Sequence, residues 1–224
     1  MNIASIRILG CTLLAWSLLS GPARAAGLDD DILHLQEEWA VANYKTKAGE
    51  TKVKAFEALA QRAAAVSAQY PQRAEPLVWE GIVLSTYAGA KGGLGALSLA
   101  KQARVKLEKA LQMDASALNG SVYTSLGTLY HKVPGFPLGF GDDKKARLYL
   151  EKAIAINPAG IDPNYFYGEY LFDTGKHVQA REHLQRALRA PAREGREVAD
   201  AGRRQEVAAL LEKVDGKANR QATR

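Results

Sequence analysis

The sequence predicts an all-α fold built from antiparallel helix pairs, and three observations support this. Strand patterns are nearly absent, because apolar residues recur at spacings of three and four rather than two. Ala and Leu dominate, with Lys, Glu, Gln and Arg between them, and all of these residues favour helices. A Gly followed by an Ala, Leu, Ala triplet occurs three times along the chain, which indicates an internal repeat.

The clearest repeat unit spans residues 162–191. Asp162 can cap a first helix, Pro163 fits its first turn, and Gly175 can end it. Each unit then has its glycine on the first helix and its triplet on the second: Gly81 with Ala103, Leu107 and Ala110; Gly127 with Ala146, Leu150 and Ala153; Gly168 with Ala180, Leu184 and Ala187. Small residues let two helix backbones approach closely, and such a pair must stack on its neighbours to bury both faces.

This pattern resembles the tetratricopeptide repeat (TPR). The middle unit matches it most fully, with Tyr123, Leu126-Gly127 and Tyr130 before the triplet and Pro158 after it. The resemblance implies an α-solenoid in which the first helix of each pair lines a concave groove. By position, that groove would include Val78, Ile82 and Ser85 from the first unit, Thr124, Thr128 and His131 from the second, and Tyr165, Glu169 and Phe172 from the third.

Two units depart from the regular spacing. Twelve residues separate Gly168 from Ala180, but the equivalent spacing is 19 in the middle unit and 22 in the first. The sequence therefore predicts two inserted Gly-rich turns, at residues 86–95 and 133–141. With these insertions the chain resembles exported TPR proteins associated with TRAP-type transporters. It is more distantly similar to the TPR domain of the regulator-of-microtubule-dynamics family, some members of which bind lipids.

Each inserted turn has two interpretations. The first is a flexible turn that needs positive φ angles, or an anion site in which Lys91 lies among glycine N–H groups. The second is unusually apolar for a surface turn, with Phe136, Leu138 and Phe140. It is either a lid folded onto the core or a hydrophobic contact site for a ligand, lipid or protein.

The domain organisation follows from the repeat and from the first 25 residues. Residues 1–25 combine Arg7, an apolar run over residues 8–19 and an Ala-Arg-Ala site, so we expect a signal peptide cleaved before Ala26 and a periplasmic protein. An uncleaved anchor, or lipidation of Cys11, is the alternative. Residues 26–215 form the repeat domain, with an N-terminal helix pair (26–73), three repeats (74–191) and a C-terminal capping helix (192–215). Residues 216–224 are predicted to be a disordered tail.

Composition and motifs argue against several function classes. Without the leader the chain has no cysteine, and the leader removes two of the 30 basic residues, leaving 28 against 24 acidic ones. This mild excess does not favour nucleic-acid binding. The four histidines do not pair at helical spacing, and no HExxH motif occurs, so we expect no metal. No catalytic motif is present, and we expect neither enzymatic activity nor a cofactor.

The remaining hypotheses concern binding. The first is an exported scaffold or adaptor that binds a protein partner through its groove and inserted loops, such as the solute-binding protein of a transporter. The alternative is a small-molecule or lipid-binding module with a pocket under the two loops, lined by Tyr87, Phe136 and Phe140. Both leave the oligomeric state open. The candidate binding residues are Tyr87, Lys91, Tyr123, Thr128, His131, Phe136, Phe140, Tyr165, Glu169 and Phe172.

Overall fold

Nine helices make up residues 22–222, the part of the chain that the computed structural model describes. The all-α prediction is confirmed for these residues, none of which lies in a β-strand. The helices are α1 (Pro22–Tyr44), α2 (Glu50–Gln69), α3 (Ala74–Lys91), α4 (Gly93–Met113), α5 (Ala117–Lys132), α6 (Asp143–Ile156), α7 (Ile161–Asp173), α8 (His177–Leu188) and α9 (Glu197–Ala222).

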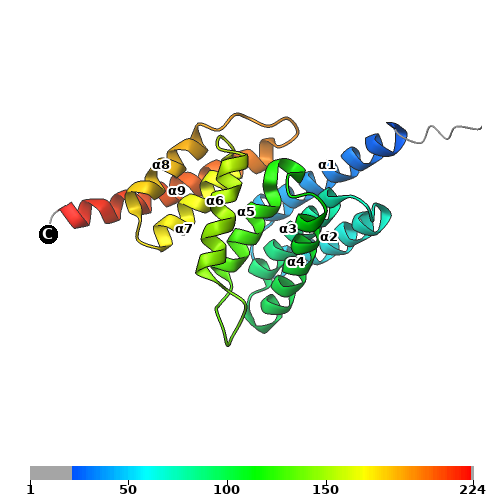
Figure 1. The fold of residues 1–224 in the computed structure, drawn as a ribbon, viewed down its shortest axis with the longest axis horizontal. Coiled ribbons are helices and arrows are strands. Elements are labelled where there is room, and N and C mark those ends of the chain that lie inside the picture. The colour runs from blue at the N-terminus through cyan, green and yellow to red at the C-terminus, as the bar shows by residue number, and fades with distance from the viewer. Residues whose placement is uncertain (1–21, 223–224) are drawn as a thin grey trace, which may run out of the picture.

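Consecutive helices pack against one another in pairs: α1 with α2, α3 with α4, α5 with α6, and α7 with α8 (Figure 1). This arrangement is compatible with a helical repeat protein. The N-terminal helix pair predicted over residues 26–73 corresponds to α1 and α2, and α1 begins earlier, at Pro22. Trp39, Phe56 and Leu59 of this pair are all buried.

The same close contact recurs in the three central pairs. A Cβ atom placed on Gly81, Gly127 or Gly168 would lie 2.5, 2.7 or 2.9 Å from the Cγ atom of the leucine facing it. Those leucines, Leu107, Leu150 and Leu184, are fully buried, as are the alanines on either side of them. The glycine and the alanines therefore bring the two helices of each pair together, as the sequence pattern predicts.

The first predicted insertion is not a loop. α3 continues to Lys91 and α4 begins at Gly93, so only Gly92 separates the two helices. The insertion lengthens both helices, since Ala88 and Ala90 favour helix, and the chain reverses at Gly92 and Gly93, whose φ angles are 63° and 59°. The prediction of a Gly-rich turn over residues 86–95 is corrected accordingly.

The second predicted insertion is a loop between α5 and α6 that projects from the bottom of the molecule in Figure 1. Its two arms are held together by the Gly141 N–H, which donates to the Pro134 carbonyl at 2.9 Å. Asp142 then caps α6 by accepting a hydrogen bond from the Lys145 N–H at 3.0 Å. Phe136 is 94% exposed and Leu138 73% exposed.

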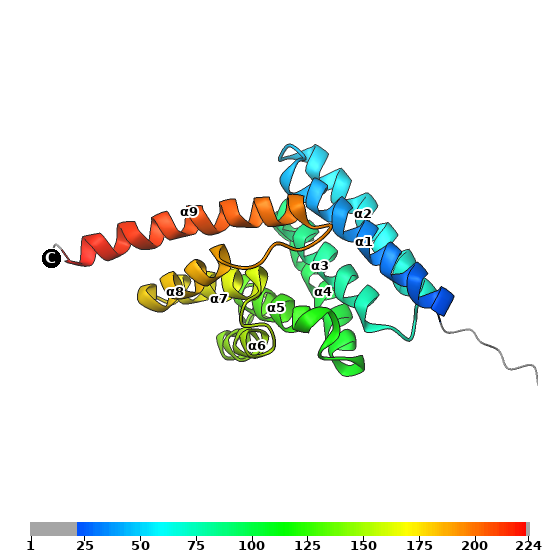
Figure 2. The same cartoon turned by 90° about the horizontal axis from the view of Figure 1, so that it is seen from above.

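The last helix crosses the repeats rather than ending them. α9 packs against α8 and α7 and also reaches α1, at the other end of the chain (Figure 2). Val207 and Leu210 of α9 are buried. α9 continues through residues 216–222, where the sequence predicts a disordered tail; apart from Gly216, most of these residues favour helix.

The predicted signal peptide lies outside the described residues except for residues 22–25, which begin α1. Within the described range, no helix combines the length and the apolar character needed to cross a membrane.

Candidate binding pocket

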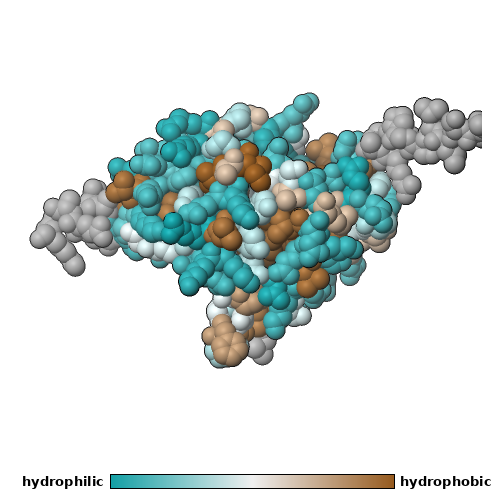
Figure 3. Space-filling view, in the orientation of Figure 1, coloured by the Kyte–Doolittle hydropathy of each residue, from teal (hydrophilic) through white to brown (hydrophobic). Residues whose placement is uncertain are grey.

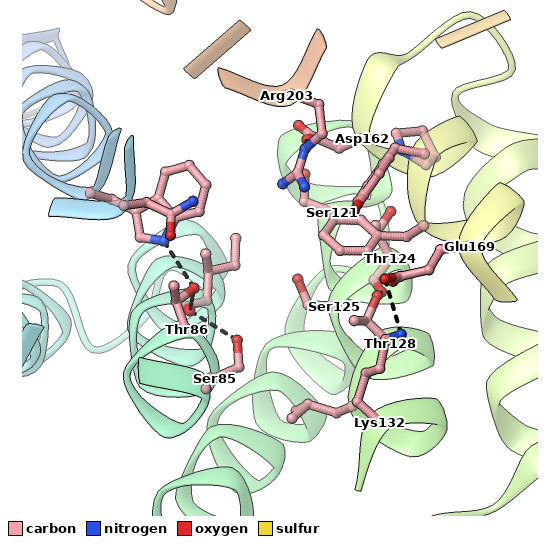
Figure 4. A pocket seen from close by; sticks show the side chains of 18 of the residues that line it. Ser85, Thr86, Ser121, Thr124, Ser125, Thr128, Lys132, Asp162, Glu169 and Arg203 are labelled. Carbon is pink, nitrogen blue, oxygen red and sulfur yellow. Dashed lines mark hydrogen bonds and ion pairs between the residues drawn. The ribbon is translucent and has the colours of Figure 1, made fainter. Parts of the chain in front are cut away.

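A large cavity lies where α1, α3, α4, α5, α7 and the start of α9 converge (Figure 4). Its volume is about 1070 Å³, at the upper end of the range of roughly 300–1,000 Å³ typical for ligand pockets. The first helices of the three repeats contribute the middle of its wall. α1 and α9 close it from opposite ends of the sequence, because α9 packs against both α7 and α1.

Six Ser and Thr hydroxyl groups line the cavity. Four of them lie on one face of α5, at the spacings of three and four that a helix requires: Ser121, Thr124, Ser125 and Thr128 (Figure 4). The other two, Ser85 and Thr86, come from α3.

Several of these hydroxyl hydrogens are already used within the helices. Thr128 donates to the Thr124 carbonyl at 2.8 Å, and Ser85 and Thr86 donate to the Ile82 carbonyl, each at 2.9 Å. Thr86 in turn accepts a hydrogen bond from the Trp39 indole N–H at 3.0 Å. Hydroxyls bonded in this way offer lone pairs rather than hydrogens, so they favour a ligand with donor groups or an apolar surface.

The rest of the wall is largely apolar. Trp39 and Trp79 meet edge to face, with ring centres 6.2 Å apart, where α1 and α3 adjoin the start of α9. Tyr165 and Phe166 of α7 also line the cavity, with ring centres 5.1 Å apart. These four rings supply a large contact area at low conformational cost.

A network of ion pairs fixes α9 against α7 at the edge of the pocket. Arg203 Nε donates to Asp162 Oδ1 at 2.8 Å, and Arg203 Nη1 to Glu206 Oε2 at 2.6 Å. The same guanidinium lies 4.6 Å from the ring centre of Tyr165 and 4.5 Å from that of Phe166. Only 8% of the Arg203 side chain is exposed, so these partners must compensate the cost of removing its charge from water.

Asp162 is shared by two arginines. Its second oxygen accepts from Arg193 Nη1 at 2.8 Å, and Arg193 also pairs with Asp200 at 2.5 Å. Burial alone would raise the pKa of Asp162, but the charges of Arg203 and Arg193 outweigh it and lower that pKa to about 2. The carboxylate is therefore ionised at every physiological pH.

A second charged group lies at the opposite side of the pocket, where α5 faces α7. Lys132 Nζ is 3.0 Å from Glu169 Oε1 and 3.0 Å from Asp173 Oδ2. Burial lowers the pKa of Lys132, but Glu169 and Asp173 more than compensate and raise it. His131 also contacts Asp173, with its Nε2 at 2.9 Å.

Three of the ten candidate residues line the cavity: Thr128, Tyr165 and Glu169. The groove positions Ile82, Ser85 and Thr124 line it as well, as the TPR resemblance implies. The other seven candidates, which lie elsewhere, are Tyr87, Lys91, Tyr123, His131, Phe136, Phe140 and Phe172.

Those seven have other surroundings. Tyr87 is 5% exposed and lies in the core, with Lys91 Nζ 3.5 Å from its hydroxyl. Tyr123 packs against Tyr149 of α6 with ring centres 6.0 Å apart, and Phe140 packs edge to face on Tyr130 at 5.6 Å.

Phe172 lies against His177, with ring centres 5.4 Å apart. The pocket expected between Tyr87, Phe136 and Phe140 is therefore not formed by those residues. Both insertions still border the cavity, through Gly89, Gly93, Val133 and Leu138.

The sequence reasoning missed the residues that close the pocket, chiefly Trp39, Trp79, Asp162, Arg193 and Arg203. Trp39 belongs to α1, which the groove prediction did not include. Trp79 belongs to α3, for which the groove prediction named other positions. The arginines follow the last repeat, where no periodic signal relates them to α7. A run of four arginines between residues 193 and 204, in a helix expected only to cap the stack, is the one signal that could have drawn attention to them.

Comparison with protein-family models gives no match for this chain, and comparison with curated proteins gives none either. Among the described residues, no group of three or more His, Cys, Asp or Glu side chains is arranged to hold a metal ion.

Proposed function

We propose that this protein is a TPR-like helical repeat protein that binds a small, largely apolar molecule in the cavity closed by α9. The observation that carries the proposal is the cavity itself, with about 1070 Å³ and walls made mainly of aromatic and aliphatic side chains. A pocket with apolar walls and a few fixed polar groups is the usual form of a small-molecule site. The repeated Gly–Leu contact in the three central pairs supports the TPR assignment.

The proposal includes export of the protein and its association with a TRAP-type transporter. It places residues 1–25 as the leader and the pocket on the outer side of the inner membrane. A binding protein in that location would meet solutes before or after they are transported. This part rests on the leader sequence and on the resemblance of the repeats.

The test uses native mass spectrometry of the protein purified from the exported fraction. We expect a retained small molecule, and we expect the Ser125→Trp variant, which places a bulky ring in the cavity, to lose it. Ser98→Trp is the matched control, because Ser98 lies exposed on α4, outside the cavity. A protein that carries nothing, and whose two variants bind apolar probes equally well, would refute the proposal.

A protein-scaffold function is the second candidate, and the loop between α5 and α6 supports it. Phe136 and Leu138 are exposed at the end of this projection, whose apolar colouring is visible in Figure 3. Changing both residues to Ser should abolish capture of an exported partner in a pull-down. Val178→Ser, at an apolar residue of α8 that is 76% exposed, is the control. Equal capture by all three proteins would rule out the loop as the contact.

A further inference from the structure

Arg196 is distinctive among the charged residues that line the pocket. It lies just before α9, and its guanidinium carbon is 5.2 Å from the ring centre of Trp79. Its Nη1 donates to Gln36 Oε1 at 2.9 Å. These contacts place the side chain where α1, α3 and α9 meet, beside the edge-to-face pair of Trp39 and Trp79.

The neighbouring arginines are neutralised, but Arg196 is not. Arg193, Arg203 and Arg204 each pair with a carboxylate of Asp162, Asp200 or Glu206. Three arginines therefore share three carboxylates, and Arg196 adds a fourth positive charge. Among the described residues no acidic side chain forms an ion pair with Arg196, which keeps only the neutral amide of Gln36.

Two hydrogen-bond donors at this place lack acceptors. The Arg196 Nε atom is buried with no hydrogen-bond partner, and so is the indole nitrogen of Trp79 beneath it. Burial, followed by the charge of Arg193, lowers the pKa of Arg196. A cation that is partly removed from water and has no ion-pair partner is costly unless an anion accompanies it.

We propose that Arg196 binds the carboxylate of an amphipathic ligand whose apolar part lies along Trp39, Trp79 and the alanines of α4 in the same cavity. This inference rests on the proposed function and names its ligand class, a monocarboxylate with an apolar chain or ring. A guanidinium binds a carboxylate through charged N–H bonds, and Arg196 lines the cavity without an ion-pair partner. One additional negative charge also balances the four arginines against the three carboxylates.

The alternative is that Arg196 only ties the start of α9 to α1 and α3. The two roles predict different ligand selectivity, because a purely mechanical link does not distinguish a charged ligand from an uncharged one of the same shape. The probes are decanoate and 1-decanol, which share a chain and differ in charge, titrated calorimetrically into the full chain at pH 7. The wild-type comparison needs no variant and so does not depend on the folding of one.

We expect the wild type to bind decanoate at least about tenfold more tightly than 1-decanol, the usual scale for a charged hydrogen bond. In Arg196→Gln, which can still donate to Gln36 but carries no charge, this preference should disappear while 1-decanol affinity stays within about twofold. Arg196→Lys should keep part of the preference. Arg189→Gln, at an exposed arginine after α8, is the control and should behave as the wild type does.

Each other outcome has a definite meaning. Equal affinity of the wild type for the two probes, or a preference that survives Arg196→Gln, overturns the inference and leaves the proposed function standing. An equal loss of affinity for both probes in Arg196→Gln also overturns the inference, because that is the result expected if Arg196 only holds α9 in place. If neither probe binds the wild type and Ser125→Trp changes no retained ligand, the proposed function fails and the inference fails with it.

Discussion

Replacing Asp162 by Ala tests whether the ion-pair network holds α9 across the repeats. Both oxygens of this carboxylate are used, one by Arg203 and one by Arg193, each at 2.8 Å. The change leaves the buried Arg203 with Glu206 alone and the partly buried Arg193 with Asp200 alone. Because α7 carries Asp162 and α9 carries Arg203, the damage should fall on the contact between those two helices.

Two routes give similar magnitudes. Removing one partner of a buried ion pair costs about 3–5 kcal/mol, and the second carboxylate kept by each arginine favours the lower end, about 3 kcal/mol. Independently, a pKa of about 2 instead of 3.8 for Asp162 corresponds to on the order of 2 kcal/mol of stabilisation by the ionised form. For a domain of this size, about 3 kcal/mol lowers the melting temperature by roughly 6–12 °C.

The assay is guanidinium denaturation followed by circular dichroism, with hydrogen exchange to locate the effect. We expect faster exchange in α9 than in α3 to α6, since the lost contacts join α9 to α7. The control is Asp215→Ala, which breaks the pair with Arg181 between α8 and α9. Both of those side chains are 46% exposed, so the loss should stay below about 1 kcal/mol. If Asp162→Ala costs no more than Asp215→Ala, the buried network is not what holds α9.

Three further predictions address the helix pairs, the pH dependence and the α5–α6 loop. Gly127→Ala should lower the free energy of unfolding by about 1–3 kcal/mol, because the new Cβ would lie 2.7 Å from the facing leucine. In the control Gly89→Ala no atom lies within 4 Å of the new Cβ, so the free energy of unfolding should rise by up to about 1 kcal/mol. The pKa of Asp162 is lowered to about 2, so its stabilising effect should be complete above about pH 4 and be lost as the pH falls towards 2. Chemical denaturation at pH 5 and at pH 3 should therefore show a smaller drop in the free energy of unfolding for Asp162→Asn than for the wild type. Phe140→Ala should lower the free energy of unfolding by about 1–2 kcal/mol, because it removes aromatic contacts. Phe136→Ser, at a residue 94% exposed, should change that free energy by less than about 0.5 kcal/mol. Equal effects of the two variants would mean that Phe140 does not pack against the helices.

The helix pairs could be predicted from the sequence because their contacts are short-range. A glycine and a leucine that meet across a pair, such as Gly168 and Leu184, are separated by one turn and the following helix. Their positions are set by helical periodicity within each element. The same local reasoning accounts for Asp142, which caps the helix that begins at the next residue, α6. It failed at residues 86–95, because alanines between glycines extend a helix as readily as they form a turn.

The pocket could be predicted only in part because its walls come from segments far apart in the chain. Thr128, Tyr165 and Glu169 were found because they share the inner face of the first helices in each pair. Arg203 was not, because its contact with Asp162 spans 41 residues and depends on where α9 lies. The periodicity of the repeats does not predict where a helix that follows the last repeat packs.

That path links binding to stability. α9 contributes Arg203 and Glu206 to the wall of the cavity, and the segment before it contributes Arg193 and Arg196. A ligand that fills the cavity therefore contacts α9 and the repeats together, and it can bind fully only when α9 is in place. By linkage, a free ligand concentration of 100 times the dissociation constant stabilises the form in which α9 is docked on the repeats by about 2.7 kcal/mol. This is close to the loss expected for Asp162→Ala, so a bound ligand should offset most of that loss and slow hydrogen exchange in α9 first.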